Sequence, residues 1–138
     1  MSPRNTGTGS VLEAMILPAL SHGGYNYTSQ QVIGRRFGGG RHIVDAIAEK
    51  DKHRFLISLK WQQTGGTAEQ KVPFEVISLA EVVLAGEFKK AYLVLGGEGW
   101  TLRDFYVSGD LKNHLLRADR VEILTLESFV ARANKGDL

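Results

Sequence analysis

The sequence predicts a single α/β domain with a mixed central β-sheet flanked by helices. Its 138 residues match the usual size of one domain, roughly 100–200 residues. The shares of hydrophobic residues (43%) and charged residues (23%) are those of an ordinary globular protein. The hydrophobic pattern changes along the chain between the periods typical of helices and of strands. The resulting order, α-β-β-β-α-β-α-β-α, predicts that helices cover a mixed sheet.

The first half of the chain is expected to hold one helix and three strands. The helix is predicted over 10–20, where apolar residues recur on one face and Pro18 distorts the end. The predicted strands cover residues 25–33, 41–48 and 54–62. A basic, glycine-rich connection precedes the second strand, and a charged turn follows it. The second and third strands are therefore expected to form an antiparallel hairpin.

The second half is expected to complete the sheet and its helical cover. A helix is predicted over 68–85, with Pro73 either kinking it or marking its start. The elements expected after it are a strand over 91–95, helical or irregular structure over 102–116, a strand over 121–126 and a helix over 127–134. We expect residues 1–8 to form a flexible arm ahead of the domain at 9–138.

Composition excludes several classes of protein. There is no cysteine, which excludes a disulfide scaffold, a thiol enzyme and a cysteine zinc site. No apolar run approaches the roughly 18 residues that span a bilayer, and the polar N-terminus lacks an apolar signal core. We therefore expect a cytoplasmic protein without a membrane partner. The net charge of +2 permits a nucleic-acid partner without arguing for one.

The predicted hairpin carries the residues with chemical potential. Ser58, Lys60 and Gln62 share one face of its second strand, because side chains alternate along a strand. A turn centred near Asp51 places Asp45 opposite the residue before Ser58, although a slip of one residue would move Asp45 to the other face. An aspartate can hold Mg²⁺, and a neighbouring lysine can position a water molecule and balance phosphate charge. These residues suit metal-assisted phosphodiester hydrolysis.

The sequence here resembles the PD-(D/E)XK nuclease superfamily, the fold of many restriction enzymes and Holliday-junction resolvases. The matching stretches are Ile43-Val44-Asp45, Phe55-Leu56-Ile57-Ser58-Leu59-Lys60-Trp61-Gln62 and Gly65-Gly66-Thr67-Ala68-Glu69-Gln70-Lys71. The resemblance covers about residues 9–95. It implies a restriction-endonuclease-like fold and a Mg²⁺-dependent DNA endonuclease, with Mn²⁺ as a possible substitute. The products would carry 5′-phosphate ends.

One position departs from the family pattern. The family usually has Asp or Glu two residues before the lysine, and this chain has Ser58. Some restriction enzymes of the superfamily have Ser-x-Lys and supply a glutamate from the following helix. By that resemblance Glu75 is the favoured substitute, ahead of Glu69. Glu13 on the first helix is a further candidate for the metal.

The resemblance also assigns roles to the remaining residues. Asp45 would bind the metal with Glu75 or Glu13, and the Leu59 backbone carbonyl is a possible further ligand. Lys60 would orient or activate the attacking water, and Gln62 would support it. The expected contacts to DNA phosphates are Arg35, Arg36, Arg41, His42 and Lys71.

Two further expectations concern assembly and activity. A chain of this size has one site, and cutting both strands of a duplex favours two chains, so we expect a homodimer or higher homo-oligomer. Restriction, homing and junction-resolving enzymes all stay open. The alternative is a catalytically inactive DNA-binding or scaffold member of the same fold, in which no carboxylate replaces the one missing at Ser58.

Overall fold

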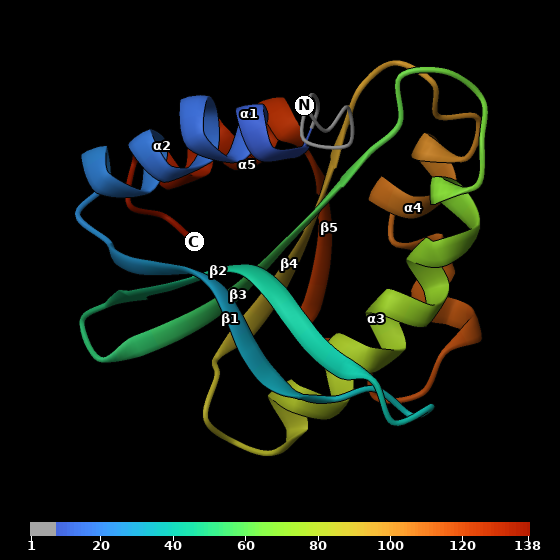
Figure 1. Ribbon diagram of the computed structural model, residues 1–138, viewed down its shortest axis with the longest axis horizontal. Helices are drawn as coiled ribbons and strands as arrows, with labels where there is room; N and C mark the ends of the chain where they lie inside the picture. The colour runs from blue at the N-terminus through green and yellow to red at the C-terminus, as the bar shows by residue number, and fades with distance from the viewer. Residues whose placement is uncertain (1–7) are drawn as a thin grey trace.

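A five-stranded mixed sheet forms the centre of the computed structural model, which describes residues 8–138 (Figure 1). The strand order follows the chain, from β1 to β5. The strands are β1 (Asn26–Arg35), β2 (Arg41–Lys50), β3 (His53–Trp61), β4 (Lys90–Gly96) and β5 (Val121–Thr125). The first three run antiparallel to one another, and β3, β4 and β5 are parallel. The predicted mixed sheet is confirmed, while the arm expected at 1–8 lies outside the described residues except for Thr8.

Helices cover both faces of this sheet, as the sequence predicts. They are α1 (Thr8–Val11), the π-helical turn η2 (Leu12–Ile16), α2 (Leu17–His22), α3 (Ala68–Leu84), α4 (Arg103–Val107), the 3₁₀ turn η3 (Asp110–His114) and α5 (Leu126–Asn134). The first three elements and α5 lie on one face, and α3, α4 and η3 lie on the other (Figure 1). Within residues 8–138, no helix has the length and apolar character needed to cross a membrane.

Pro18 marks the irregular part of the first helix. The Leu17 N–H donates to the Leu12 carbonyl, which widens the helix into a π turn directly before the proline. Pro18 has no N–H with which to continue the regular ladder. The predicted distortion is present, and the helix nevertheless continues to His22.

Pro73 lies inside α3 rather than at its start. A proline removes the hydrogen bond that the carbonyl four residues earlier would accept. That carbonyl belongs to Glu69, and it accepts a hydrogen bond of 2.6 Å from the buried Tyr106 hydroxyl instead. The helix therefore passes through its proline because a side chain from α4 replaces the lost donor.

The sheet separates two apolar cores, and alternation along β3 shows which side chains enter each. Phe55, Ile57 and Leu59 face α2 and α5, whereas Leu56 faces α3. The next residues on the α3 side are Ser58 and Lys60. On the α3 side, the face of β3 is therefore apolar up to Leu56 and polar from there to the end of the strand.

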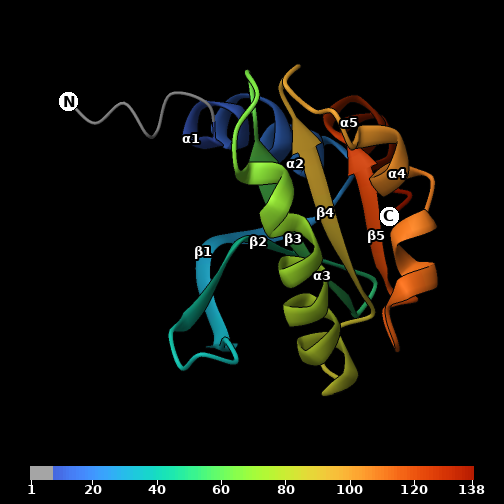
Figure 2. The same cartoon turned by 90° about the vertical axis from the view of Figure 1, so that its right-hand side faces the viewer.

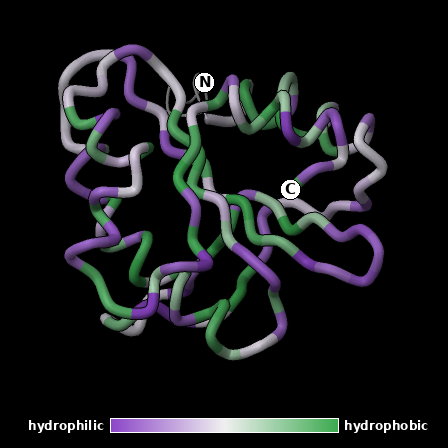
Figure 3. The backbone as a smooth tube through the Cα atoms, turned by 180° about the vertical axis from the view of Figure 1, so that it is seen from behind, coloured by the Kyte–Doolittle hydropathy of each residue, from purple (hydrophilic) through white to green (hydrophobic). Residues whose placement is uncertain are grey.

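The observed register between β2 and β3 differs by one residue from the register predicted from the sequence. Lys50 pairs with His53, and Ala46 pairs with Ile57. The turn is the dipeptide Asp51-Lys52, with φ angles of 54° and 70°, which suits the right-handed twist of a tight hairpin. The turn is centred between these two residues rather than on Asp51. Figure 3 shows it as a hydrophilic loop.

The outer half of the β1–β2 hairpin bends out of the sheet on the side of α3 (Figure 2). Pairing between β2 and β3 ends at Ala46 and Ile57, whereas pairing between β1 and β2 continues to Arg35 and Arg41. Opposite the bend, Gln30 has a positive φ of 55°. The bend brings the end of the hairpin against α3 and positions the groups described next.

Candidate active site

Asp45 lies where β2 separates from β3. Val44 packs in the core beneath α3, and Ala46 packs in the core on the opposite face, so the strand changes its facing at Asp45. The separation leaves the Leu59 N–H without a partner on β2, and Asp45 Oδ2 accepts it at 2.7 Å. The Asp45 carboxylate thus replaces the backbone carbonyl of β2 that would otherwise accept this hydrogen bond.

The environment of Asp45 opposes its negative charge. Burial is the main cause that raises its pKa above the ordinary value, and the Glu75 carboxylate adds to this. The Leu59 N–H, the Lys60 ammonium and the Gln30 side chain act in the opposite direction and do not fully compensate. A half-buried carboxylate with a raised pKa is a group whose charge a bound cation would stabilise.

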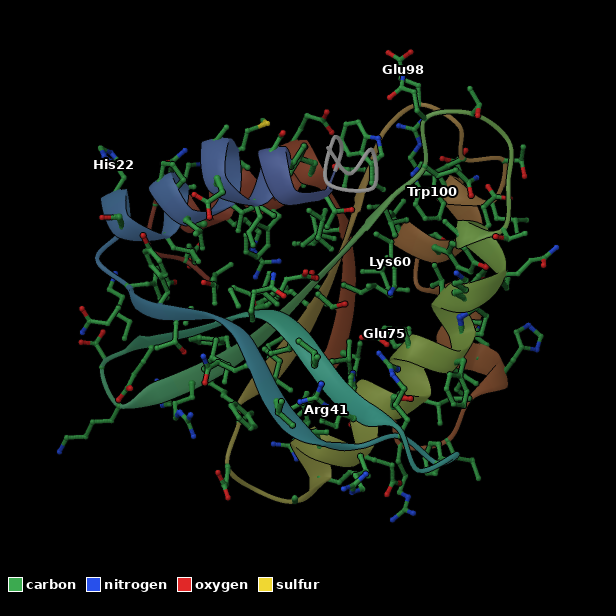
Figure 4. The ribbon with its side chains drawn as sticks, in the orientation of Figure 1. His22, Arg41, Lys60, Glu75, Glu98 and Trp100 are labelled. Carbon is green, nitrogen blue, oxygen red and sulfur yellow. The ribbon has the colours of Figure 1, made fainter. Side chains whose placement is uncertain are left out.

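Lys60 acts on two carboxylates. It is half-buried on the α3 face of β3, and its ammonium favours the charged forms of both Asp45 and Glu75. Figure 4 shows Lys60 and Glu75 extending toward each other from β3 and α3. The structure thus brings together the aspartate, the lysine and the helical glutamate that the sequence singled out.

Glu75 is buried on the face of α3 that meets the hairpin and is held by three side chains. Arg36 donates to Oε1 at 2.7 Å, Ser58 donates to Oε2 at 3.0 Å, and the His42 ring nitrogen lies 3.2 Å from Oε2. Burial alone would raise the pKa of Glu75, but the hydrogen bond with His42, the Lys60 ammonium and the Arg36 guanidinium lower it to about 2. Glu75 is therefore ionised at every pH at which the protein would work.

Gln62 and Glu69 lie nearby but have structural partners. Gln62 is buried, its Nε2 donates to the Gly99 carbonyl at 2.7 Å, and its Oε1 accepts the Glu69 N–H at 3.2 Å. The Glu69 carboxylate accepts hydrogen bonds from the Thr101 N–H and hydroxyl and from the Leu102 N–H, which hold its pKa below the ordinary value. The two side chains fasten the start of α3 to the loop before α4.

Two candidate metal ligands lie in different surroundings. Glu13 is exposed on the π-helical turn of the first helix, which packs on the opposite face of the sheet from α3. Leu59 is buried next to Lys60, and its N–H anchors Asp45. The carbonyl of Leu59 belongs to the same strand end as the Lys60 side chain.

The basic residues expected to contact phosphates divide into two groups. Arg35, Arg41 and Lys71 are exposed, and Figure 4 shows Arg41 on the outer half of β2. Arg36 is partly exposed and paired with Glu75, and His42 is buried against the same carboxylate. Alternation along β2 is the signal that could have placed His42 inward, because Val44, two residues later, is buried on the same side.

The donor set fits a hard divalent cation that keeps much of its water. In the part of the chain that the structure describes, no group of three or more His, Cys, Asp or Glu side chains could hold a metal. Mg²⁺ needs only one or two carboxylates when water and phosphate supply the other oxygens. A carboxylate offers about four lone-pair sites. Three of those on Glu75 are engaged, which leaves one on Oε1, and the Glu75 carboxylate is near enough to Asp45 to raise its pKa.

Comparisons with known proteins place this chain in the class of nuclease-type α/β domains. The model of the PD-(D/E)XK nuclease superfamily domain matches residues 4–137. The chain belongs to this superfamily, and the resemblance found in its sequence is confirmed. No curated protein matches the chain.

A solved structure supports the fold. The crystal structure of a protein of unknown function, AF1548, matches with a TM-score of 0.51 and 13% sequence identity. The match covers 80% of this chain and 54% of the other, so this chain spans about half the length of that one. At this identity the likeness concerns the fold alone.

Proposed function

We propose that this protein is a Mg²⁺-dependent DNA endonuclease that hydrolyses phosphodiester bonds, with Mn²⁺ able to replace Mg²⁺. Superfamily membership indicates a nuclease-type function in general. The observation that supports the finer proposal is the grouping of Asp45, Lys60 and Glu75 where β2 leaves β3. It joins two carboxyl groups to one ammonium group, which is the set of groups that metal-assisted phosphoryl transfer requires.

In this proposal Asp45 and Glu75 hold the metal, and the Leu59 carbonyl is a further donor. The ion would polarise the phosphate and lower the pKa of a bound water. The Leu59 N–H fixes the Asp45 carboxylate through Oδ2 and leaves Oδ1 for binding. Ser58 and His42 fix the Glu75 carboxylate from the β-sheet side.

Lys60 positions the attacking water and balances charge on the phosphate. Its half-buried ammonium extends from the same strand as Ser58 and lies near both carboxylates. Arg35 and Arg41 on the β1–β2 hairpin and Lys71 on α3 are exposed, and in this proposal they supply cations for the flanking phosphates of the DNA. Because each chain holds one such group, we propose a homodimer for cleavage of both strands in the cytoplasm.

A second function has a specific observation in its favour. The ion pair of 2.7 Å between Arg36 and Glu75 neutralises the carboxylate that would complete the metal site. If Arg36 keeps this position when DNA is bound, its positive charge opposes a cation at Glu75, and the protein is a DNA-binding member of the fold without cleavage activity.

Cleavage of supercoiled plasmid and of a four-way junction distinguishes the endonuclease from the inactive DNA-binding protein. The assay compares the wild type, Lys60→Ala and the control Lys52→Ala, which changes an exposed lysine on the β2–β3 turn. We expect cutting by the wild type and the control with Mg²⁺ or Mn²⁺, none with chelator, and loss of at least a hundredfold in Lys60→Ala. DNA binding in a gel shift with no cleavage by any protein would instead support the second function.

A further inference from the structure

Two phenylalanine side chains lie exposed and in contact beside the candidate active site. Phe37 is at the tip of the β1–β2 hairpin with 61% of its surface exposed, and Phe74 is on α3 with 47% exposed. Their ring centroids are 6.0 Å apart, with an angle of 64° between the ring planes. Single exposed apolar residues are common, but a contacting aromatic pair from two separate elements indicates a binding surface.

The chain fixes this pair next to the site. Phe37 follows Arg36 and Phe74 precedes Glu75, and the ion pair between Arg36 and Glu75 links the two elements directly beside the rings. The pair therefore lies on the same two elements, the β1–β2 hairpin and α3, that supply Arg36 and Glu75 to the site.

The charge around the rings favours a nucleic acid over a protein as the occupant. Arg35 and Arg41 are exposed and face each other as partners at the end of the hairpin. The turn between them contains Gly38, Gly39 and Gly40, each with open space where a side chain would be. The glycines let the backbone approach a phosphate closely, and two arginines at the edge of an apolar contact suit an anionic partner.

We propose that Phe37 and Phe74 form a stacking site for an unpaired nucleobase, with Arg35 and Arg41 on the flanking phosphates. In an uninterrupted duplex both faces of each base are already stacked, so exposed phenylalanine rings gain little. An unpaired base has free faces, and stacking on an aromatic side chain stabilises it. The substrate class is therefore DNA with unpaired bases next to a duplex, such as a fork or a branch. This inference rests on the proposed function only in that DNA is the ligand.

Binding measured without cleavage tests the inference. Fluorescence anisotropy in chelator compares a labelled duplex with a fork of the same length and sequence. We expect the wild type to bind the fork at least tenfold more tightly than the duplex. Phe37→Ala should lose about tenfold in affinity for the fork and little for the duplex, because one stacked base contributes roughly that much. Phe37→Trp should keep the preference, and 2-aminopurine at the fork should be quenched by wild type but not by Phe37→Ala.

The control is Leu116→Ala, which removes a more exposed apolar side chain, 91% exposed, from the loop after η3. It should leave the preference for the fork unchanged. Equal affinity of the wild type for fork and duplex, or an equal loss for both in Phe37→Ala, would overturn the inference. A fall in self-association of Phe37→Ala with unchanged fork binding would overturn it too, by assigning the rings to an interface between copies.

The outcome separates this inference from the proposed function. A protein that binds forks through Phe37 and cuts nothing would retain the stacking site and lose the nuclease proposal. A protein that cuts plasmid through Lys60 and shows no preference for forks would retain the nuclease proposal and lose the stacking site.

Discussion

Ser58 Oγ donates a hydrogen bond of 3.0 Å to Glu75 Oε2, which joins β3 to α3 two residues before Lys60. Ser58 occupies the position where the superfamily usually has an acid, and it touches the carboxylate that we propose as the replacement. In our proposal the acid is supplied by α3 instead of β3, and this contact keeps it next to the position of Ser58.

This contact predicts that the carboxylate can be moved back to the strand. Glu75→Gln alone should abolish metal-dependent cleavage. The double variant Ser58→Asp with Glu75→Gln should recover activity to within about two orders of magnitude of wild type, because one carboxylate again lies beside Asp45 and Lys60. Plasmid nicking rates measure this. Ser58→Asp alone places two like charges together, and it should be less stable than the wild type above pH 5.

Glu75 should make the stability of the protein depend on pH at the acid end. Its pKa is lowered from 4.5 to about 2, so its contribution is fully present above pH 4.5 and is lost as the pH falls toward 2. The shift corresponds to about 3 kcal/mol. Urea unfolding should show Glu75→Gln less stable by that order at pH 7, with a much smaller difference at pH 3. An equal difference at both pH values would contradict the ionic origin.

Asp45 should behave in the opposite way. Its raised pKa means that the ionised form opposes folding at neutral pH, and that this cost disappears as the pH falls below the ordinary value of 3.8. Asp45→Asn can still accept the Leu59 N–H, so it should be more stable than wild type at pH 7, by roughly 1 kcal/mol. The melting temperature in chelator measures the gain. Added Mg²⁺ should raise the melting temperature of the wild type and not that of the variant.

Arg36 should compete with metal for Glu75. Removing its guanidinium frees Oε1 and takes a positive charge from the site, so Arg36→Ala should bind Mn²⁺ more tightly than wild type, by about tenfold. Calorimetric titration with Mn²⁺ measures the affinity. Arg35→Ala is the matched control, since Arg35 donates to the Gly39 carbonyl and not to Glu75. Unchanged or weaker Mn²⁺ binding in Arg36→Ala would mean that Glu75 is not a metal ligand.

Tyr106 and Pro73 should be energetically coupled. Tyr106→Phe leaves the Glu69 carbonyl without a donor and should cost about 1–3 kcal/mol. With Pro73→Ala, the backbone supplies an N–H to the same carbonyl, so Tyr106→Phe should cost less in that background. A double-mutant cycle in urea unfolding measures the coupling. Equal costs in both backgrounds would show that the hydroxyl does not replace the missing backbone donor.

Much of the fold could be predicted from the local pattern of apolar and turn residues in the sequence. Every predicted strand and helix is present, because period and turn residues set them without reference to the rest of the chain. The exact register of the β2–β3 hairpin was missed by one residue. The charged turn contains no glycine to mark its centre, and Asp51 and Lys52 both adopt positive φ.

The surroundings of the candidate site could be predicted only in part. Asp45, Lys60 and Glu75 were singled out by resemblance, and the structure brings them together. The burial of His42 against Glu75 depends on the hairpin bending across α3, which involves elements far apart in sequence. The engagement of Gln62 with Gly99 likewise depends on a loop more than thirty residues later, so side-chain alternation could give its face but not its partner.

The polar side chains of the site, Arg36, His42, Asp45, Lys60 and Glu75, all come from residues 36–75. The strands and helices after this range supply packing and no member of the group. The site is therefore a portable unit of two hairpins and a helix. A designer who transplants the unit needs to reproduce the surface on which α3 and β3 rest, and also the hydrogen bonds by which residues 99–106 hold the start of α3.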